Sequence, residues 1–279
     1  MLPVWLDGEL LDPGDARVPV FDHGLTVGDG AFETLRTTPE PGTGRWVPFA
    51  VRRHLARLRR SLDGLGLHLH RSDDELRDAL TAVGDQIGGP GRVRLTVTGG
   101  PGPLGSGRDD APLTVFVAGT GIEPWPSTGA AATVPWRRNE HSAVAGLKTT
   151  SYAENVVALA RAKELGADEA IFANTAGQLC EGTGSNVFVV LGGTLRTPPL
   201  SSGCLAGITR ELVCELLDVV EEDLPLSVLD EADEVFLTSS TRDVQGLHRV
   251  DHRQLDAPGP VTRKAAAAFA DLVARDVDP

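Results

Sequence analysis

The stretch "DEAIFANTAGQLCEGTGSNVFVVLGGTLRTP", residues 168–198, carries the pattern that decides the fold. Its apolar runs alternate with turn signals at "NTAG" and "LGGT", which is typical of a meander of β-strands. Within the meander, Glu181 stands between apolar residues and a Gly-Thr-Gly run. Glycines on an interior strand permit close approach by a ligand or by another backbone. We therefore expect Glu181 either to face a ligand or to lie on a β-bulge at the surface.

The rest of the chain mixes helices and strands and predicts an α+β or α/β protein. Leu55, Leu58 and Leu62 recur at helical spacing in "VPFAVRRHLARLRRSLDGLGL", and Ser72 opens a Ser-x-x-Glu pattern that marks a second helix start. The segments "GRVRLTVTGG" and "APLTVFVAG" indicate strands, and "GITRELVCELLDVV" indicates a helix. The Gly- and Pro-rich segment "GTGIEPWPSTG" is a candidate linker. We predict a smaller N-terminal α/β domain over residues 1–118, a linker over 119–129 and a strand-rich C-terminal domain over 130–279.

Composition narrows the classes of function. The chain has 279 residues, 41% of them hydrophobic and 23% charged, with a formal net charge of −13. This acidity argues against a nucleic-acid binder, although a small anionic substrate could still bind in a local positive site. The three cysteines lack metal-ligand or disulfide spacing, so we expect no metal site. Without a signal peptide or an apolar run of about 18 residues, the sequence predicts a cytoplasmic protein that does not enter a membrane.

Lysine is rare in this chain, and Lys148 is the one that lies outside a predicted helix. The other two are Lys163 and Lys264. Lys148 occurs in "GLKTTSYAEN", just before a helix whose start Ser151 and Glu154 predict as a capping box. Partial burial would lower the pKa of its amine and make it a nucleophile toward a carbonyl group. The alternative is an ordinary lysine of a surface loop.

Three further motifs suggest a phosphate. In "AGITREL", Ile208 and Thr209 open a helix, whose N–H groups and dipole favour an anion, although Thr209 could be an ordinary N-cap. The "LTSST" segment offers hydroxyls after a strand, and "HLARL" places His54 and Arg57 on one helix face, where a solvated stripe is the alternative. An amine, a carboxylate for a ring nitrogen and phosphate donors together match the binding needs of pyridoxal phosphate.

With these motifs in order, the sequence resembles the class IV aminotransferases, the pyridoxal-phosphate enzymes of fold type IV. The resemblance runs from "GLTVGDGAFETLRT" through "HLARLRRS", "GLKTTSYAEN" and "GADEAIFANTAGQLCEGTGSNVFVV" to "GCLAGITRELV" and "ADEVFLTSS". It implies a homodimer of chains with a small N-terminal and a larger C-terminal domain.

The resemblance also implies roles for individual residues. Lys148 corresponds to the Schiff-base lysine and Glu181 to the partner of the ring nitrogen. Arg57 corresponds to a phosphate-binding arginine, and Leu205 to the apolar residue that packs on the cofactor ring. The remaining phosphate contacts are implied at Ile208, Thr209 and Ser240.

Among the members of the family, the form of "GAFETLRT" most resembles a 4-amino-4-deoxychorismate lyase, which forms 4-aminobenzoate and pyruvate for folate biosynthesis. Gly99 stands where the D-amino-acid enzymes and some lyases have an arginine. The residues that bind the substrate carboxylates are therefore open, and the candidates are His23, Arg94, Arg137 and Arg138. The alternative activity is that of an aminotransferase acting on branched-chain amino acids, D-amino acids or amines. A more remote alternative is a cofactor-binding protein without turnover.

Overall fold

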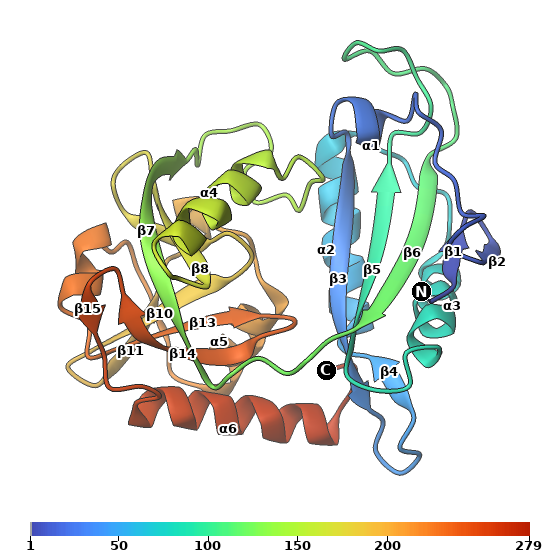
Figure 1. Ribbon diagram of the computed structural model, residues 1–279. Coiled ribbons are helices and arrows are strands. Elements are labelled where there is room, and N and C mark those ends of the chain that lie inside the picture. Colours follow the sequence, from blue (N-terminus) through green and yellow to red (C-terminus); the bar gives the residue numbers. More distant parts are fainter. Residues whose placement is uncertain (1) are drawn as a thin grey trace. The chain divides into compact units, whose positions relative to one another are not determined.

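The computed structural model describes residues 2–279, and the chain divides into two compact units (Figure 1). The first unit comprises Met1–Pro124, Leu147–Tyr152 and Leu272–Pro279, and the second comprises Trp125–Gly146 and Ala153–Asp271. Each unit has a β-sheet of its own, with helices packed on it. The two-domain α+β fold predicted from the sequence is thereby confirmed.

The first unit is built on a six-stranded sheet with the order β2-β1-β6-β5-β3-β4. Its strands are β1 (Val4–Leu6), β2 (Glu9–Leu11), β3 (Gly30–Pro39), β4 (Trp46–Pro48), β5 (Gly91–Thr98) and β6 (Thr114–Gly121). Its helices are α1 (His23–Thr26), α2 (Val51–Leu65) and α3 (Asp73–Asp85). The predicted capping box at Ser72 is present at the start of α3, and α2 ends at Gly66 in the left-handed conformation.

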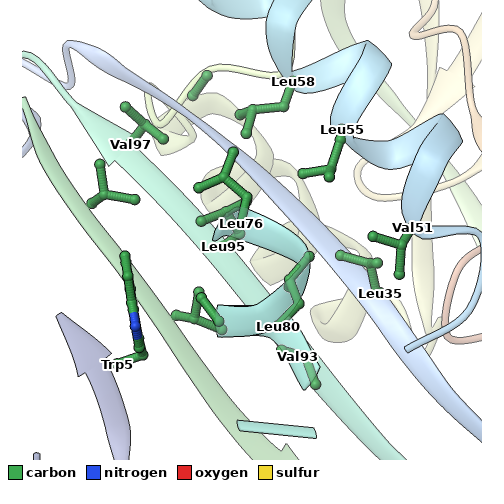
Figure 2. Close-up of a cluster of buried hydrophobic side chains, with 14 of the residues drawn as sticks. Trp5, Leu35, Val51, Leu55, Leu58, Leu76, Leu80, Val93, Leu95 and Val97 are labelled. Carbon is green, nitrogen blue, oxygen red and sulfur yellow. The ribbon is translucent and has the colours of Figure 1, made fainter. Parts of the chain in front are cut away.

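The core of the first unit lies between the sheet and helices α2 and α3. Figure 2 shows leucines of both helices, among them Leu55, Leu58 and Leu80, facing Val93 and Leu95 of β5. Because side chains alternate across a strand, the residues between these valines and leucines point to the other face of the sheet. The same alternation in β3 puts the side chains at positions 31, 33 and 35 on the helix side and those at 32 and 34 on the opposite side.

The second unit is built on a nine-stranded sheet. Along it the strands run β12-β11-β10-β13-β14-β7-β8-β9, with β15 paired to β14. The strands are β7 (Thr128–Arg138), β8 (Glu169–Asn174), β9 (Leu179–Gly182), β10 (Asn186–Leu191), β11 (Thr194–Thr197), β12 (Val220–Glu221), β13 (Glu234–Ser239), β14 (Asp243–Val250) and β15 (Arg253–Gln254). The helices are α4 (Ala153–Glu164), α5 (Ile208–Leu216) and the 3-10 turns η1 (Leu200–Ser202) and η2 (Leu226–Asp230). Helix α6 (Pro260–Arg275) belongs to this unit up to Asp271, and its last turn belongs to the first unit. The meander predicted over residues 168–198 is β8 to β11.

The units divide the chain differently from the predicted domains. Strand β6 continues to Gly121 and β7 begins at Thr128, so only 122–127 of the predicted linker lies outside a strand. The segment Leu147–Tyr152 belongs to the first unit, although the prediction assigned its lysine to the C-terminal domain. Hydrogen bonds explain this, because Phe32 N–H donates to the Lys148 carbonyl and Thr150 N–H to the Gly30 carbonyl.

The capping box predicted at Ser151 and Glu154 is not formed. The Ser151 hydroxyl donates to the carbonyl of Gly28, and the Glu154 carboxylate pairs with Arg138. Helix α4 accordingly begins one residue later than a Ser151 cap requires, at Ala153. Within residues 2–279, no helix has both the length and the apolar character needed to cross a bilayer.

Candidate active site

The predicted site residues divide between the two units. The first unit carries His23, Arg57, Arg94 and Lys148, and the second carries Arg137, Arg138, Glu181, Leu205, Ile208, Thr209 and Ser240. Each group is described within its own unit.

The backbone of Lys148 is fixed by two elements of the first unit. Its N–H donates to the Ser61 hydroxyl of α2 at 3.1 Å, and its carbonyl accepts from Phe32 N–H of β3 at 3.0 Å. Leu147, the preceding residue, fills the space above Gly64 of α2, where an added Cβ would lie 2.7 Å from the leucine side chain. The lysine thus starts from a rigid point between a strand and a helix.

The amine of Lys148 lies against aromatic rings. Its Nζ is 4.5 Å from the centre of the Phe32 ring and 5.8 Å from that of Tyr152. The two rings meet edge to face at 5.1 Å. Lys148 is half-buried, which is the partial burial that a nucleophilic lysine requires. Aromatic neighbours and a fixed backbone are unlike the setting of an ordinary loop lysine.

Arg57 belongs to a buried charged cluster with Glu33 and His54. Glu33 Oε1 accepts from Arg57 Nε at 2.8 Å, and Oε2 accepts from Arg57 NH2 at 2.7 Å. His54 Nδ1 lies 2.6 Å from the same Oε2. The three side chains are at most 4% exposed. The solvated helix stripe considered for His54 and Arg57 is therefore wrong.

The electrostatics of this cluster favour an ionised Glu33 and a neutral His54. Burial alone would raise the pKa of Glu33, but the charges and hydrogen bonds of Arg57 and His54 outweigh it and lower that pKa to about 2. Burial lowers the pKa of His54 below its ordinary value, with Glu33 opposing the shift and the cations Arg57 and Lys148 adding to it. Arg57 is therefore held as a cation in a site of very low exposure.

Glu181, in the second unit, is held by two donors. Arg138 Nε donates to Oε1 at 3.1 Å, and Leu205 N–H donates to Oε2 at 2.9 Å. Arg138 also pairs with Glu154 and stacks on the Phe172 ring at 4.0 Å. The register of β8 against β9 shifts beside Glu181, as the predicted bulge requires, but the Glu181 side chain is only 14% exposed. It is an oriented, largely buried carboxylate, so the surface position considered as an alternative is wrong.

The start of α5 has the form of an anion site. Its N-cap is Gly207, which has no capping side chain, so Thr209 is not an ordinary N-cap. A Cβ on Gly207 would lie 1.9 Å from Asn186 Oδ1, and the amide of that asparagine donates to the Leu205 carbonyl. The glycine therefore lets the helix start approach the residues that hold Glu181. Ser240 lies in the turn between β13 and β14.

The four candidates for binding substrate carboxylates have different surroundings. Arg94 lies on the sheet face opposite the helices, with its guanidinium 3.6 Å from the Phe32 ring centre. Within residues 2–279 no carboxylate pairs with Arg94, which is exposed like Arg137. Arg138 lies on Glu181 instead. Arg94 thus shares a ring with Lys148, which places a cation and the amine on one side chain.

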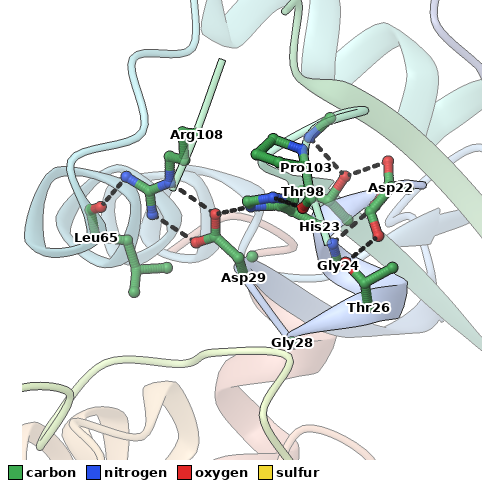
Figure 3. Close-up of polar contacts among 12 residues, drawn as sticks. Asp22, His23, Gly24, Thr26, Gly28, Asp29, Leu65, Thr98, Pro103 and Arg108 are labelled. Carbon is green, nitrogen blue, oxygen red and sulfur yellow. Dashed lines mark hydrogen bonds and ion pairs between the residues drawn. The ribbon is translucent and has the colours of Figure 1, made fainter. Parts of the chain in front are cut away.

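His23 belongs to a polar network at the start of β3 (Figure 3). It is buried, its Nε2 donates to the Pro103 carbonyl at 2.9 Å, and its Nδ1 is 3.4 Å from Asp29. Arg108 forms two hydrogen bonds with Asp29 and holds the pKa of that carboxyl below its ordinary value. A side chain at Gly99 would collide with Asp29, because an added Cβ would lie 2.5 Å from its Oδ2. An arginine at position 99 would therefore displace this network.

Comparison with known proteins decides the family. Residues 30–250 match the family described as Amino-transferase class IV, which is well over half of the chain.

The chain belongs to the class IV aminotransferases.

The proteins that this chain resembles are named for different activities, aminotransferase or lyase. A branched-chain-amino-acid aminotransferase of Pseudomonas aeruginosa is 30% identical over 97% of this chain and 92% of its own. An aminodeoxychorismate lyase of Bacillus subtilis is 30% identical over 86% of this chain and 84% of its own. The crystal structure of a branched-chain aminotransferase from Thermoproteus uzoniensis with norvaline has a TM-score of 0.91 and 30% identity, covering 99% of this chain and 97% of that one.

Class IV aminotransferases use pyridoxal phosphate, and the side chains of this member fit that cofactor. The donor set contains a half-buried amine, an oriented carboxylate, a buried arginine and a helix start without a capping side chain. The amine suits an aldehyde carbon and the carboxylate suits a protonated ring nitrogen, whereas the arginine and the helix start both suit a phosphate.

Sequence reasoning did not assign Glu33, Phe32 or Tyr152 to this class IV site. Glu33 could have been found, because it is a carboxylate at a core-facing position between Ala31 and Leu35. Phe32 and Tyr152 carried no such signal, since an aromatic residue in a strand or before a helix is ordinary.

Proposed function

We propose that the protein is a pyridoxal-phosphate-dependent aminotransferase that accepts branched-chain amino acids as amino donors. The observation that carries this proposal is the nearly full-length match to proteins named branched-chain aminotransferases, in sequence and in structure. It favours the aminotransferase alternative over the lyase activity predicted from the sequence.

The arrangement of residues supports a division of roles. Lys148 would hold the cofactor and move the proton at the substrate carbon that bears the amine. Glu181, held by Leu205 N–H and Arg138, would keep a proton on the ring nitrogen. Arg57 and the start of α5, with Ser240, would bind the phosphate. The cofactor supplies an electron sink for the bond that is broken.

Arg94 is the candidate that best suits a substrate carboxylate. It is an exposed cation without a carboxylate partner within residues 2–279, and its guanidinium stacks on the ring that Lys148 also contacts. His23 is buried in the Asp29 network, and Arg138 lies on Glu181. Arg137 is exposed as well, but only Arg94 among the four candidates stacks on the ring that Lys148 contacts, so we propose Arg94 as the counter-charge of an anionic amino substrate.

Aminodeoxychorismate lyase activity is the second candidate. It is supported by the relative of that name in Bacillus subtilis, which matches most of the chain at 30% identity. Both reactions need the same lysine and the same ring-nitrogen partner, so these residues do not separate the two activities.

A homodimer is part of the proposal. The segment around α1 exposes large apolar side chains, among them Val20, Phe21 and Leu25, at 54–70% exposure. Leu104 is also 70% exposed, on a loop that Gly102 N–H ties to the Phe21 carbonyl. We define these four residues as the α1 patch. Clustered apolar surface of this kind is typical of a protein interface.

Paired assays of the purified holoenzyme test the activity. One assay supplies L-leucine with 2-oxoglutarate and measures L-glutamate, and the other supplies aminodeoxychorismate and measures 4-aminobenzoate. We expect glutamate from the first assay and its loss in Lys148→Met. Formation of 4-aminobenzoate without glutamate would show that the lyase is correct, and neither product from a cofactor-loaded protein would favour binding without turnover.

A further inference from the structure

The carboxylate of Glu33 occupies a position that an apolar side chain would normally fill. It points from β3 toward α2, between Ala31 and Leu35 of the apolar core, and is fully buried. Removing two opposite charges from water costs several kcal/mol per ion, and apolar residues of similar volume often stabilise a core as well or better. The pair with Arg57 therefore needs a reason beyond stability.

The geometry of the pair suggests that reason. Each Glu33 oxygen accepts from a different nitrogen of Arg57, which ties one edge of the planar guanidinium to the strand. A two-point contact fixes both the position and the plane of the group, whereas a single bond would let it rotate. His54 adds a bond to Glu33 Oε2 and so keeps the carboxylate itself in one orientation.

The same two elements also hold Lys148. Strand β3 bonds the lysine carbonyl through Phe32, the residue next to Glu33, and α2 bonds the lysine N–H through Ser61, one turn beyond Arg57. Strand β3 and helix α2 therefore fix the positions of both the Arg57 guanidinium and the Lys148 backbone.

We propose that Glu33 is a positioning residue that orients Arg57 to receive the phosphate group of the cofactor. The inference rests on the proposed function, in which Arg57 is a phosphate-binding residue. Glu33 acts through Arg57 and need not contact the cofactor itself.

Two effects of Glu33 on phosphate affinity oppose each other. Its negative charge weakens the attraction of the site for a phosphate. Its two-point contact with Arg57, in contrast, keeps that flexible side chain ordered before the phosphate binds. We expect the effect on orientation to dominate. Without the two-point contact, Arg57 must lose its rotamer freedom when the phosphate binds, which corresponds to a loss of about 30-fold in affinity for the phosphate.

The test compares dissociation constants for pyridoxal phosphate and for pyridoxal, which lacks the phosphate. In Glu33→Gln we expect pyridoxal phosphate to bind about 30-fold more weakly and pyridoxal to bind within about twofold of the wild type. Arg57→Met should likewise weaken the binding of pyridoxal phosphate more than that of pyridoxal. The double variant should bind pyridoxal phosphate no more weakly than Arg57→Met alone, since both substitutions act on one contact.

Two more variants control for folding. Asp22→Asn removes a buried carboxylate of the same unit that accepts from Thr98 and Thr114 hydroxyls, and it should leave the ratio of the two constants unchanged. Glu33→Asp keeps a counter-ion for Arg57 but is one methylene too short for the two-point contact, so it should also weaken pyridoxal phosphate selectively.

The outcomes are separable. Two results with a folded Glu33→Gln variant would overturn the positioning role. One is binding of pyridoxal phosphate as tight as in the wild type, and the other is an equal loss of affinity for pyridoxal and for pyridoxal phosphate. So would a Glu33→Asp variant with the wild-type ratio, because charge alone would then suffice. A wild type without preference for the phosphorylated form, or Arg57→Met with that preference intact, would instead refute the assignment of Arg57 in the proposed function.

Discussion

At the scale of single residues, Lys148 combines a fixed backbone with an amine that lies over the Phe32 ring. In Lys148→Met the chain keeps its length and its hydrogen bonds to Ser61 and Phe32, but the nucleophile is lost. We expect turnover to fall at least about 10²-fold, the lower end of what a positioned acid or base contributes, and the long-wavelength absorbance of lysine-bound cofactor to disappear. Lys163→Met on α4 is the matched control, and an equal loss there would contradict the role of Lys148.

His54 and Glu33 make a prediction about acid stability. The pKa of His54 is lower in the folded protein than its ordinary value of 6.5, so the unfolded chain binds a proton first and stability falls as the pH drops through 6.5. Glu33 titrates at about 2 when folded, against an ordinary 4.5, so its stabilisation is present above pH 4.5 and is lost between 4.5 and 2.

His54→Gln separates these two contributions. Glutamine can still donate to Glu33 but does not titrate, so the variant should lose less stability than the wild type between pH 7 and pH 5. Urea midpoints at the two pH values measure the difference. Equal losses in both proteins would mean that His54 is already protonated in the folded state.

At the scale of secondary-structure elements, Gly64 shows how a helix and the lysine segment depend on each other. Gly64→Ala should favour α2 by about 1 kcal/mol through helix propensity alone. Its methyl group would, however, lie within 2.9 Å of both terminal carbons of Leu147, next to Lys148. We expect no net gain in melting temperature and weaker cofactor binding.

Two companions make the Gly64 prediction specific. Gly84→Ala on α3 meets Pro48 carbons at 3.2 Å and a Val93 carbon at 3.8 Å, far from Lys148 in the chain, and should leave cofactor affinity unchanged. Adding Leu147→Ala to Gly64→Ala removes the clash and should restore much of the affinity. Normal affinity in Gly64→Ala alone would show that the lysine segment tolerates the displacement.

At the scale of the whole molecule, the α1 patch predicts self-association. Phe21→Asp combined with Leu25→Asp replaces two exposed apolar side chains by charges, and each such side chain contributes about 1.5–3 kcal/mol when buried. We expect the dissociation constant of the dimer, measured by analytical ultracentrifugation, to rise by at least about 100-fold. Leu200→Asp, at an exposed leucine outside the patch, should leave the mass unchanged, and a monomeric wild type would remove the basis for the homodimer.

Local patterns predicted most elements because they depend on neighbours in sequence. The apolar spacing of α2, the Ser72 capping box and the strand meander of residues 168–198 are all present. The Ser151 pattern failed for a reason absent from the local sequence. The Ser151 hydroxyl donates to the carbonyl of Gly28, more than a hundred residues earlier, and the Glu154 carboxylate accepts from Arg138.

The sequence by itself determined which residue types are available: a rare lysine before a helix, a carboxylate in a glycine-rich meander and an arginine on an amphipathic helix. Only the tertiary structure decided their partners. Glu33 binds Arg57 across 24 positions, and Arg138 binds Glu181 across 43. The physical reason is that a buried charge must be paired wherever the fold brings a partner, and spacing along the chain does not reveal which strand faces which helix.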